Sequence, residues 1–253
     1  SLTLPDGRTC RELTKSEIGG IVEDFRRAAR RAMDARFDGV QIHSAHAYLL
    51  SQFLSPYFNR RTDEYGGKLA NRARLHLQVL AAVRGELGDG VPVLIKMNSE
   101  DFLDGGFSRK EMVEVARMLE SEGITAVELS GGTPFSPPSR GFSRPGVQPA
   151  AEEVYYLDAA KMYKDAVSAP LVLVGGIRTL SVAEELVEKG TADLIALSRP
   201  LIREPHLVRR WREGDPANAT CIHCNLCFGP ARAGEGLYCV AERNQKQKAA
   251  QKS

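Results

Sequence analysis

The feature that most constrains the fold is a regular alternation of short β-type runs with amphipathic helical segments. A first helical segment extends from Thr14 to about Ala35, and five runs rich in Val, Ile and Leu follow it, separated by further segments of helical periodicity. The runs lie at 38–43, 91–96, 126–130, 171–176 and 193–197. Parallel strands need long crossovers, and each crossover helix covers a face of the sheet. The sequence therefore predicts an α/β fold with a parallel sheet.

A doubly wound sheet and a (β/α)₈ TIM barrel both fit this pattern. The sequence contains no Gly-x-Gly-x-x-Gly fingerprint, no Walker phosphate loop and no Gly-x-Ser-x-Gly nucleophile elbow, which favours the barrel. The length of 253 residues is close to that of a complete barrel. Five strands cannot close an eight-stranded barrel. We therefore expect only about five of the eight βα units, strands four to eight, with the N-terminal part missing.

Charge and hydrophobicity exclude several classes of partner. The chain has 34 basic and 32 acidic side chains and a formal net charge of +2, too balanced for a nucleic-acid-binding surface. No apolar run reaches the roughly 18 residues of a membrane-spanning helix, and the first residues lack the regions of a signal peptide. We expect a soluble, cytoplasmic protein with no nucleic-acid or membrane partner. The start at Ser1 suggests a chain cut from something longer, although tag removal leaves the same trace.

Polar residues gather where the predicted strands end. The carboxyl ends of barrel strands face one mouth, so these residues should converge on one ligand. After the last two strands, Gly175-Gly176 and Arg199 suit a phosphate, since a glycine turn exposes backbone N–H groups and a guanidinium can clamp oxygens. The alternative is a plain turn and a solvated surface arginine. Barrel phosphate sites commonly follow the seventh and eighth strands, which numbers these two as the last of eight.

The segment 43–48 reads HSAHAY and follows the first predicted strand. Two imidazoles, His43 and His46, beside the phenol of Tyr48 suit the stabilisation of a developing oxyanion and the delivery of a proton. Two histidines three residues apart also suit a metal, but a third ligand at recognisable spacing is missing. A histidine at a strand end can equally be a satisfied polar residue without a chemical role.

The longer segment 37–72 resembles the old yellow enzyme family of FMN-dependent oxidoreductases, and it reads FDGVQIHSAHAYLLSQFLSPYFNRRTDEYGGKLANR. The similarity continues in LIKMN, VGGIRT and ALSRPLIREPHLVRRWREGDP, and covers the chain from Arg11 to about Pro216. It implies that residues 1–216 are a partial FMN-binding TIM barrel. It also implies that NAD(P)H reduces the flavin, which then reduces the activated C=C bond of a small electrophilic alkene.

The resemblance also assigns roles to residues. It implies that His43 and His46 hydrogen-bond the substrate's carbonyl or nitro oxygen and that Tyr48 is the proton donor. Lys96 matches a position near the flavin ring that is usually Arg, where a cation favours the anionic reduced flavin. The positions that hold the FMN phosphate match Gly175, Gly176, Ser198, which replaces the more usual Gly, and Arg199. The landmark 61–67, RTDEYGG, is assigned a structural role.

Four of the five cysteines lie in the C-terminal segment 217–253, which we predict as a separate tail. The four are Cys221, Cys224, Cys227 and Cys239. The segment is similar to the iron–sulfur segment of larger family members such as 2,4-dienoyl-CoA reductase, where three residues rather than two separate the second and third ligands. Three interpretations stay open: a 4Fe-4S cluster, a zinc site with His223 as a spare ligand, and reduced cysteines without a metal.

Three functions follow from these observations. The first is an FMN-dependent NAD(P)H oxidoreductase of the ene-reductase type. The second is an iron–sulfur flavoenzyme similar to dienoyl-CoA reductase. The third is a non-catalytic barrel fragment, a binding module whose open sheet edges pair with a partner or a second copy. Substrate size should depend on the loop from Gly131 to about Pro149, because a long loop inside a compact domain is usually a functional lid.

Overall fold

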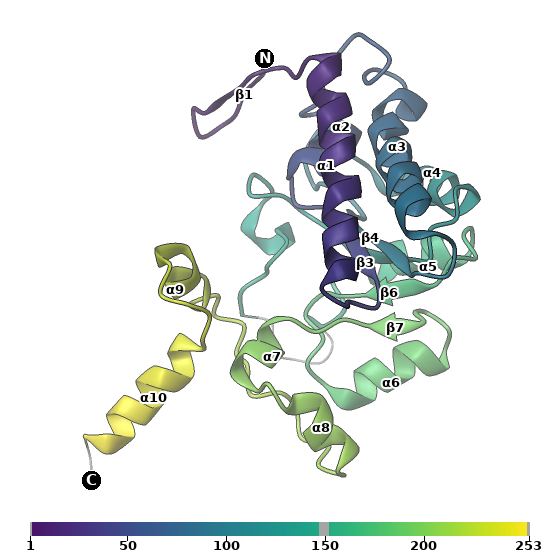
Figure 1. Ribbon diagram of the computed structural model, residues 1–253. Helices are drawn as coiled ribbons and strands as arrows, with labels where there is room; N and C mark the ends of the chain where they lie inside the picture. The colour runs from purple at the N-terminus through teal and green to yellow at the C-terminus, as the bar shows by residue number, and fades with distance from the viewer. Residues whose placement is uncertain (1, 147–151, 252–253) are drawn as a thin grey trace.

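A five-stranded parallel sheet forms the centre of the computed structural model (Figure 1), which describes residues 2–146 and 152–251. Its strand order is β3-β4-β5-β6-β7, and every neighbouring pair is parallel. The strands are β3 (Val40–Ser44), β4 (Val93–Asn98), β5 (Ala126–Ser130), β6 (Leu171–Leu173) and β7 (Leu194–Ile195). The predicted α/β fold with a parallel sheet is confirmed. The prediction placed β5 at the observed bounds and made β6 and β7 longer than they are.

Helices cover one face of this sheet. Those between the strands are α1 (Lys15–Asp34), α2 (Leu49–Leu54), α3 (Leu69–Leu87), α4 (Arg109–Ser121), α5 (Leu157–Lys164) and α6 (Leu180–Glu188). Their apolar faces pack against outward-pointing strand residues such as Ile95 and Val127 in one continuous core. Burying each large aliphatic side chain in this core contributes roughly 1.5 to 3 kcal/mol before conformational entropy is subtracted.

Two helices begin at capping boxes, a pattern of Ser or Thr with Glu three residues later that the sequence shows at 14–17 and 108–111. The Thr14 hydroxyl accepts from the N–H of Glu17 at the start of α1, and Ser108 accepts from the N–H of Glu111 at the start of α4; both glutamates return a hydrogen bond to the cap backbone. Each cap satisfies N–H groups that have no partner within the helix and stabilises it by about 1 kcal/mol.

The opposite face of the sheet is polar at its centre. Strand register aligns one row of side chains on this face: His43, Lys96, Glu128, Val172 and Leu194. His43 is exposed, and Leu194 at the β7 edge is 53% exposed. Within the described part of the chain, the outer sides of β3 and β7 pair with no further strand.

Several elements lie outside the strand–helix alternation. A small antiparallel hairpin, β1 (Leu2–Thr3) and β2 (Thr9–Cys10), precedes α1. The predicted long loop contains one short 3₁₀ helix, η1 (Pro138–Arg140), and its end at 147–149 lies outside the described residues. The C-terminal part has four short helices: α7 (Arg199–Arg203), α8 (Leu207–Arg212), α9 (Phe228–Ala233) and α10 (Val240–Ala250).

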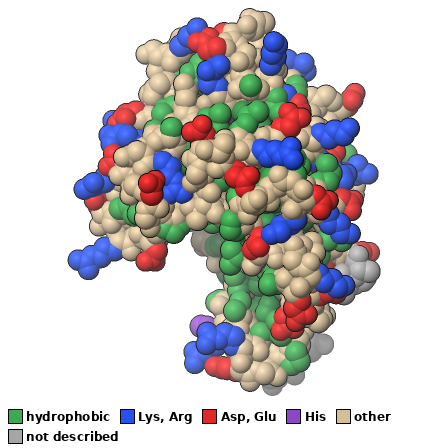
Figure 2. All heavy atoms as spheres, turned by 90° about the vertical axis from the view of Figure 1, so that its right-hand side faces the viewer, with side chains coloured by type: hydrophobic (Ala, Val, Ile, Leu, Met, Phe, Trp, Pro, Cys, Tyr) green, Lys and Arg blue, Asp and Glu red, His purple; other side chains and the backbone are tan. Residues whose placement is uncertain are grey.

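The surface carries both signs of charge. On the face turned toward the viewer in Figure 2, Lys and Arg side chains are interspersed with Asp and Glu. A search of the described helices for one that is both long and apolar enough to cross a bilayer finds none.

Candidate active site

The three residues predicted to act on a substrate lie together at the carboxyl end of β3. The ring centroids of His43 and His46 are 5.5 Å apart, and those of His43 and Tyr48 are 5.2 Å apart. Between them the chain makes a tight turn in which His46 and Ala47 have φ values of 63° and 60°. Tyr48 occupies the N-cap position of α2 without a side-chain capping bond, and it is 63% exposed. The turn therefore brings two imidazoles and a phenol to one accessible place.

The left-handed turn is held by neighbouring strand ends. The backbone N–H of His46 donates to Asn98 Oδ1 over 3.0 Å, and His46 Nε2 lies 2.7 Å from Ser130 Oγ. Asn98 in turn donates to the buried carboxylate of Asp101 over 2.9 Å. A left-handed non-glycine residue costs about 1 to 2 kcal/mol, so this turn persists only because its surroundings fix it.

Both imidazoles are neutral at neutral pH. Burial lowers the pKa of His46 to about 3, with the positive charge of Lys96 acting in the same direction. Burial and then Lys96 also lower the pKa of His43, which Glu128 partly opposes. A neutral imidazole has one N–H donor and one acceptor nitrogen. If the Ser130 hydroxyl donates to His46 Nε2, the N–H of that ring is on Nδ1.

The residues predicted to hold the cofactor line one cavity of about 250 Å³. They are Lys96, Gly175, Gly176, Ser198 and Arg199. These residues come from β4, from the loops after β6 and β7 and, for Arg199, from the start of α7; His46 lines the same cavity. The convergence expected at the carboxyl ends of parallel strands is therefore present.

The close approach of Tyr155 requires glycine at 176, and the positive φ of residue 175 favours glycine there. Gly175 and Gly176 have φ values of 133° and 80°, and a side chain at Gly176 would collide with the Tyr155 ring. The Tyr155 N–H also donates to the carbonyl of Gly175 over 3.0 Å. The glycine backbone therefore lines the cavity beside the Tyr155 and Tyr156 side chains, and accessible backbone N–H groups suit an anion.

Arg199 is oriented by neutral acceptors. Its Nη1 donates to the carbonyl of Arg144 over 2.9 Å and to Asn225 Oδ1 over 2.6 Å, and its Nη2 donates to the Tyr155 hydroxyl over 3.1 Å. None of these three partners carries a negative charge. The guanidinium is therefore fixed in direction and keeps its positive charge for a ligand, which fits the phosphate of FMN.

Lys96 lies on the polar face of the sheet, opposite the helices, and is ion-paired. Its ammonium contacts Glu128, the next residue in the register, and Gln41 Nε2 donates to the other oxygen of that carboxylate over 2.9 Å. Glu128 is only 7% exposed. The two charges thus compensate each other on the polar face of the sheet.

The four C-terminal cysteines line a second, much smaller cavity of about 20 Å³. His223 does not line it and instead faces the larger cavity. In the described ranges, no group of three His, Cys, Asp or Glu side chains has the geometry of a single-ion site. This arrangement does not favour zinc with His223 as a ligand. Burial raises the pKa of the Cys221 and Cys227 thiols.

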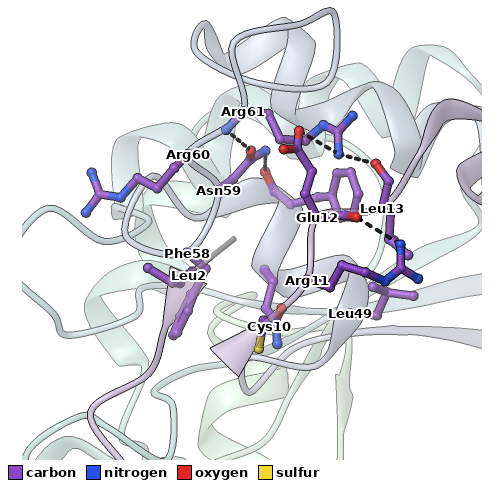
Figure 3. Close-up of a pocket in the computed structure, with 12 residues that line it drawn as sticks. Leu2, Cys10, Arg11, Glu12, Leu13, Leu49, Phe58, Asn59, Arg60 and Arg61 are labelled. Carbon is purple, nitrogen blue, oxygen red and sulfur yellow. Dashed lines mark hydrogen bonds and ion pairs between the residues drawn. The ribbon is translucent and has the colours of Figure 1, made fainter. Parts of the chain in front are cut away.

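A third cavity, of about 140 Å³, lies between the β1–β2 hairpin and α2 and contains none of the predicted site residues (Figure 3). Arg61 borders it, with its Nη1 donating to the carbonyl of Leu13 over 2.7 Å and its Nη2 2.5 Å from Asp63. The bond to Leu13 links the 61–67 segment to the residues that precede α1, and the bond to Asp63 lies within the segment.

Two residues that orient Arg199 were not predicted, Tyr155 in the larger cavity and Asn225 beside the cysteine cavity. The periodicity of 154–167 predicts a helix that would include Tyr155, whereas α5 begins only at Leu157, and Asn225 lies between cysteines that indicated a metal site. Ser130 and Asn98, by contrast, stand at predicted strand ends, where their polar character was the signal.

Comparison with known proteins gives a consistent match. Residues 5–218 match the NADH:flavin oxidoreductase / NADH oxidase family. An NADH oxidase of Thermoanaerobacter brockii is 35% identical over 226 residues, covering 88% of this chain and 34% of the relative. An NADPH dehydrogenase of Clostridium acetobutylicum is 37% identical over 207 residues, covering 80% and 57%.

Solved structures agree. A 2-naphthoyl-CoA reductase in complex with 2-naphthoyl-CoA has a TM-score of 0.78 at 31% identity, covering 86% of this chain and 33% of the other. An old yellow enzyme homologue from Zymomonas mobilis has a TM-score of 0.67 at 29% identity, covering 83% and 56%. The chain therefore spans between about a third and three fifths of the length of these proteins.

Proposed function

Because the chain belongs to the NADH:flavin oxidoreductase / NADH oxidase family, we propose that it is an FMN-dependent, NAD(P)H-driven reductase of activated C=C bonds. The observation that carries the proposal is the shared cavity in which five expected cofactor residues meet His46. We further propose the cytoplasm as its location and a small electrophilic alkene as its substrate.

We propose that the five strands are strands four to eight of an eight-stranded barrel, carried by residues 1–216, with 217–253 as a cysteine-containing tail. The sequential parallel order and the polar inner face support this proposal. Further strands, from an N-terminal portion or from another chain, would then pair with the outer sides of β3 and β7.

The residues present fit FMN. Gly175 and Gly176 offer backbone to the phosphate, with Ser198 beside them, and Arg199 offers an oriented guanidinium. Lys96, paired with Glu128, lies in the same cavity toward the sheet, and its ammonium would be the cation nearest the flavin ring among these residues. When bound, FMN supplies a hydride to the β-carbon of the alkene.

The chain's own residues then handle the oxygen and the proton. The neutral imidazoles of His43 and His46 donate hydrogen bonds to the substrate oxygen as negative charge develops on it, which commonly contributes a few kcal/mol to the transition state. The exposed hydroxyl of Tyr48 delivers a proton to the α-carbon. The ring centroids of Tyr48 and His43 are 5.2 Å apart. One small molecule can therefore contact both the proton donor and an oxygen-binding group.

The test is a comparison of two tyrosine variants after FMN loading. Tyr48→Phe should lower the rate of 2-cyclohexenone reduction by roughly 10²-fold, within the usual range for a general acid, and leave flavin reduction by NAD(P)H unchanged. Tyr57→Phe removes the same hydroxyl from a partly buried ring packed on Phe58 and is the matched control. A protein that binds no FMN, or a Tyr48→Phe variant of full activity, would contradict the proposal.

A second candidate is an iron–sulfur flavoenzyme similar to dienoyl-CoA reductase. The observation that favours it is that one small cavity is bordered by Cys221, Cys224, Cys227 and Cys239. In the described structure these thiols are not yet arranged as ligands of a metal ion, so binding of a cluster would have to draw them together. Cysteine thiolates at this spacing are suitable ligands of a 4Fe-4S cluster. Iron and sulfide analysis of protein reconstituted without oxygen should then give four of each per chain, and Cys227→Ser should lower that content. Iron content that is the same in both proteins would count against the cluster.

A further inference from the structure

We infer that Asn225 is a positioning residue for Arg199, and that the cysteine segment thereby forms part of the phosphate end of the cofactor site. The inference rests on the proposed function, because it concerns the place where the FMN phosphate is proposed to bind. Asn225 lies between Cys224 and Cys227 in the sequence, far from the strands that build the cavity.

The side chain of Asn225 joins three segments. Its Oδ1 accepts from Arg199 Nη1 over 2.6 Å and from the Ser143 hydroxyl over 2.8 Å. Its Nδ2 donates to the carbonyl of Ser143 over 3.0 Å. A separate bond, from the N–H of Gly146 to the carbonyl of His223 over 3.1 Å, links the same loop to the same segment. The start of α7, the loop 131–146 and the cysteine segment are thus held at one amide group.

An amide is the right group for this position. It accepts from the guanidinium without neutralising it, whereas a carboxylate would pair with Arg199 and compete with a phosphate. Asn225 also has a φ of 62°, a left-handed conformation that asparagine tolerates better than most residues. Backbone and side chain therefore both favour asparagine here.

Loss of this side chain should act mainly at the phosphate end of the cavity, where Arg199 lies. Arg199 would keep its bonds to the Arg144 carbonyl and the Tyr155 hydroxyl but lose its shortest one. The guanidinium would then have to be ordered when the ligand binds, which weakens binding. Lys96 and His46 lie on other elements and make no bond to Asn225, although Phe142, next to Ser143, packs on the His46 ring at 5.0 Å between centroids.

The experiment titrates two flavins into the full chain and follows quenching of flavin fluorescence. FMN carries the phosphate and riboflavin lacks it. Asn225→Gly removes the side chain and accepts the left-handed backbone, and Asn225→Asp keeps the shape but adds a charge. Both variants should weaken FMN binding by about tenfold, the effect of losing one hydrogen bond to a charged group. Riboflavin binding should change less than twofold.

Asn218→Gly changes an exposed asparagine in the loop before the cysteines and is the matched control. If both Asn225 variants bind FMN within twofold of the unaltered protein, or lose FMN and riboflavin equally, the inference is wrong. If the unaltered protein binds neither flavin, the proposed function fails first and the inference falls with it.

Discussion

The backbone N–H of His46 donates to Asn98 Oδ1 over 3.0 Å, so the position of a proposed oxygen-binding group depends on a side chain from the neighbouring strand. The same amide bonds the buried carboxylate of Asp101. The expected catalytic group is thus oriented by a chain of polar contacts behind it.

Asn98→Ala should destabilise the protein, because it leaves the N–H of His46 without this acceptor and removes a donor from Asp101. Each unsatisfied buried polar group costs about 1 to 3 kcal/mol. We expect a loss of about 2 kcal/mol in the free energy of unfolding, measured by urea denaturation. Asn244→Ala, on the exposed surface of α10, is the control. Equal stability of the two variants would show that the bond to His46 does not hold the turn.

Ala47→Gly should stabilise the protein. Ala47 has a φ of 60°, which glycine adopts without steric cost, and the relief of about 1 to 2 kcal/mol exceeds the added entropy of the unfolded chain. The expected net gain is roughly 0.5 to 1 kcal/mol by urea denaturation. Ala81→Gly, at an exposed position inside α3, should instead lose about 1 kcal/mol. A loss in both variants would refute the assigned strain.

His76 should make stability depend on pH. It is 1% exposed, its Nε2 lies 2.7 Å from Ser44 Oγ, and burial lowers its pKa to about 3. In the unfolded chain the histidine has an ordinary pKa near 6.5. Between about pH 6.5 and pH 3 it is therefore protonated in the unfolded chain and neutral in the folded protein. The stability that His76 contributes is therefore complete above about pH 6.5 and is lost as the pH falls toward 3, at up to about 1.4 kcal/mol per pH unit.

His76→Gln should accordingly reduce the slope of the unfolding free energy against pH between pH 6 and pH 4. The reduction should correspond to about one proton, or about 1.4 kcal/mol per pH unit. His206→Gln, on an exposed residue before α8, provides the comparison. The assignment fails if the two variants have the same slope in urea titrations across this range.

Lys96→Met should be more harmful than the double change Lys96→Met with Glu128→Gln. The single change leaves the carboxylate of Glu128, which is 7% exposed, without its cation. Removing one partner of a buried pair costs about 3 to 5 kcal/mol, whereas replacing both costs little. The double variant should recover most of the lost unfolding free energy. The single variant Glu128→Gln completes the comparison. If the loss of unfolding free energy in the double variant equals the sum of the losses in the two single variants, the pair is not coupled.

Local signals allowed much of this fold to be predicted. The capping boxes at Thr14 and Ser108 place two helix starts, and the apolar run at 126–130 gives a strand without error. These elements depend on neighbours in sequence, which is why their residues reveal them. The β1–β2 hairpin was not predicted, although the residues of its turn, Pro5-Asp6-Gly7, are ones that favour turns.

The candidate site was predictable to a similar extent, and for a different reason. Strand ends in a parallel sheet face the same way, so Lys96, Gly175 and Arg199 could be expected together. The contacts of Tyr155 and Asn225 with Arg199 join residues 44 and 26 positions apart. Such contacts depend on how a loop and a tail fold back over the sheet, and no periodicity or local motif encodes that path.

The order of strands in the sheet also has a consequence for biosynthesis. In the five-stranded sheet, each strand from β4 to β7 pairs with the strand before it in the sequence. This sheet can therefore grow stepwise from β3 to β7 while the ribosome is still producing the chain. The residues that line the larger cavity lie between positions 46 and 228 in the sequence. Its described lining can therefore form only after the cysteine segment has left the ribosome. A ligand that binds only the folded cavity cannot stabilise the intermediates that precede it during synthesis. The stability of those intermediates must come from the core between the sheet and its helices.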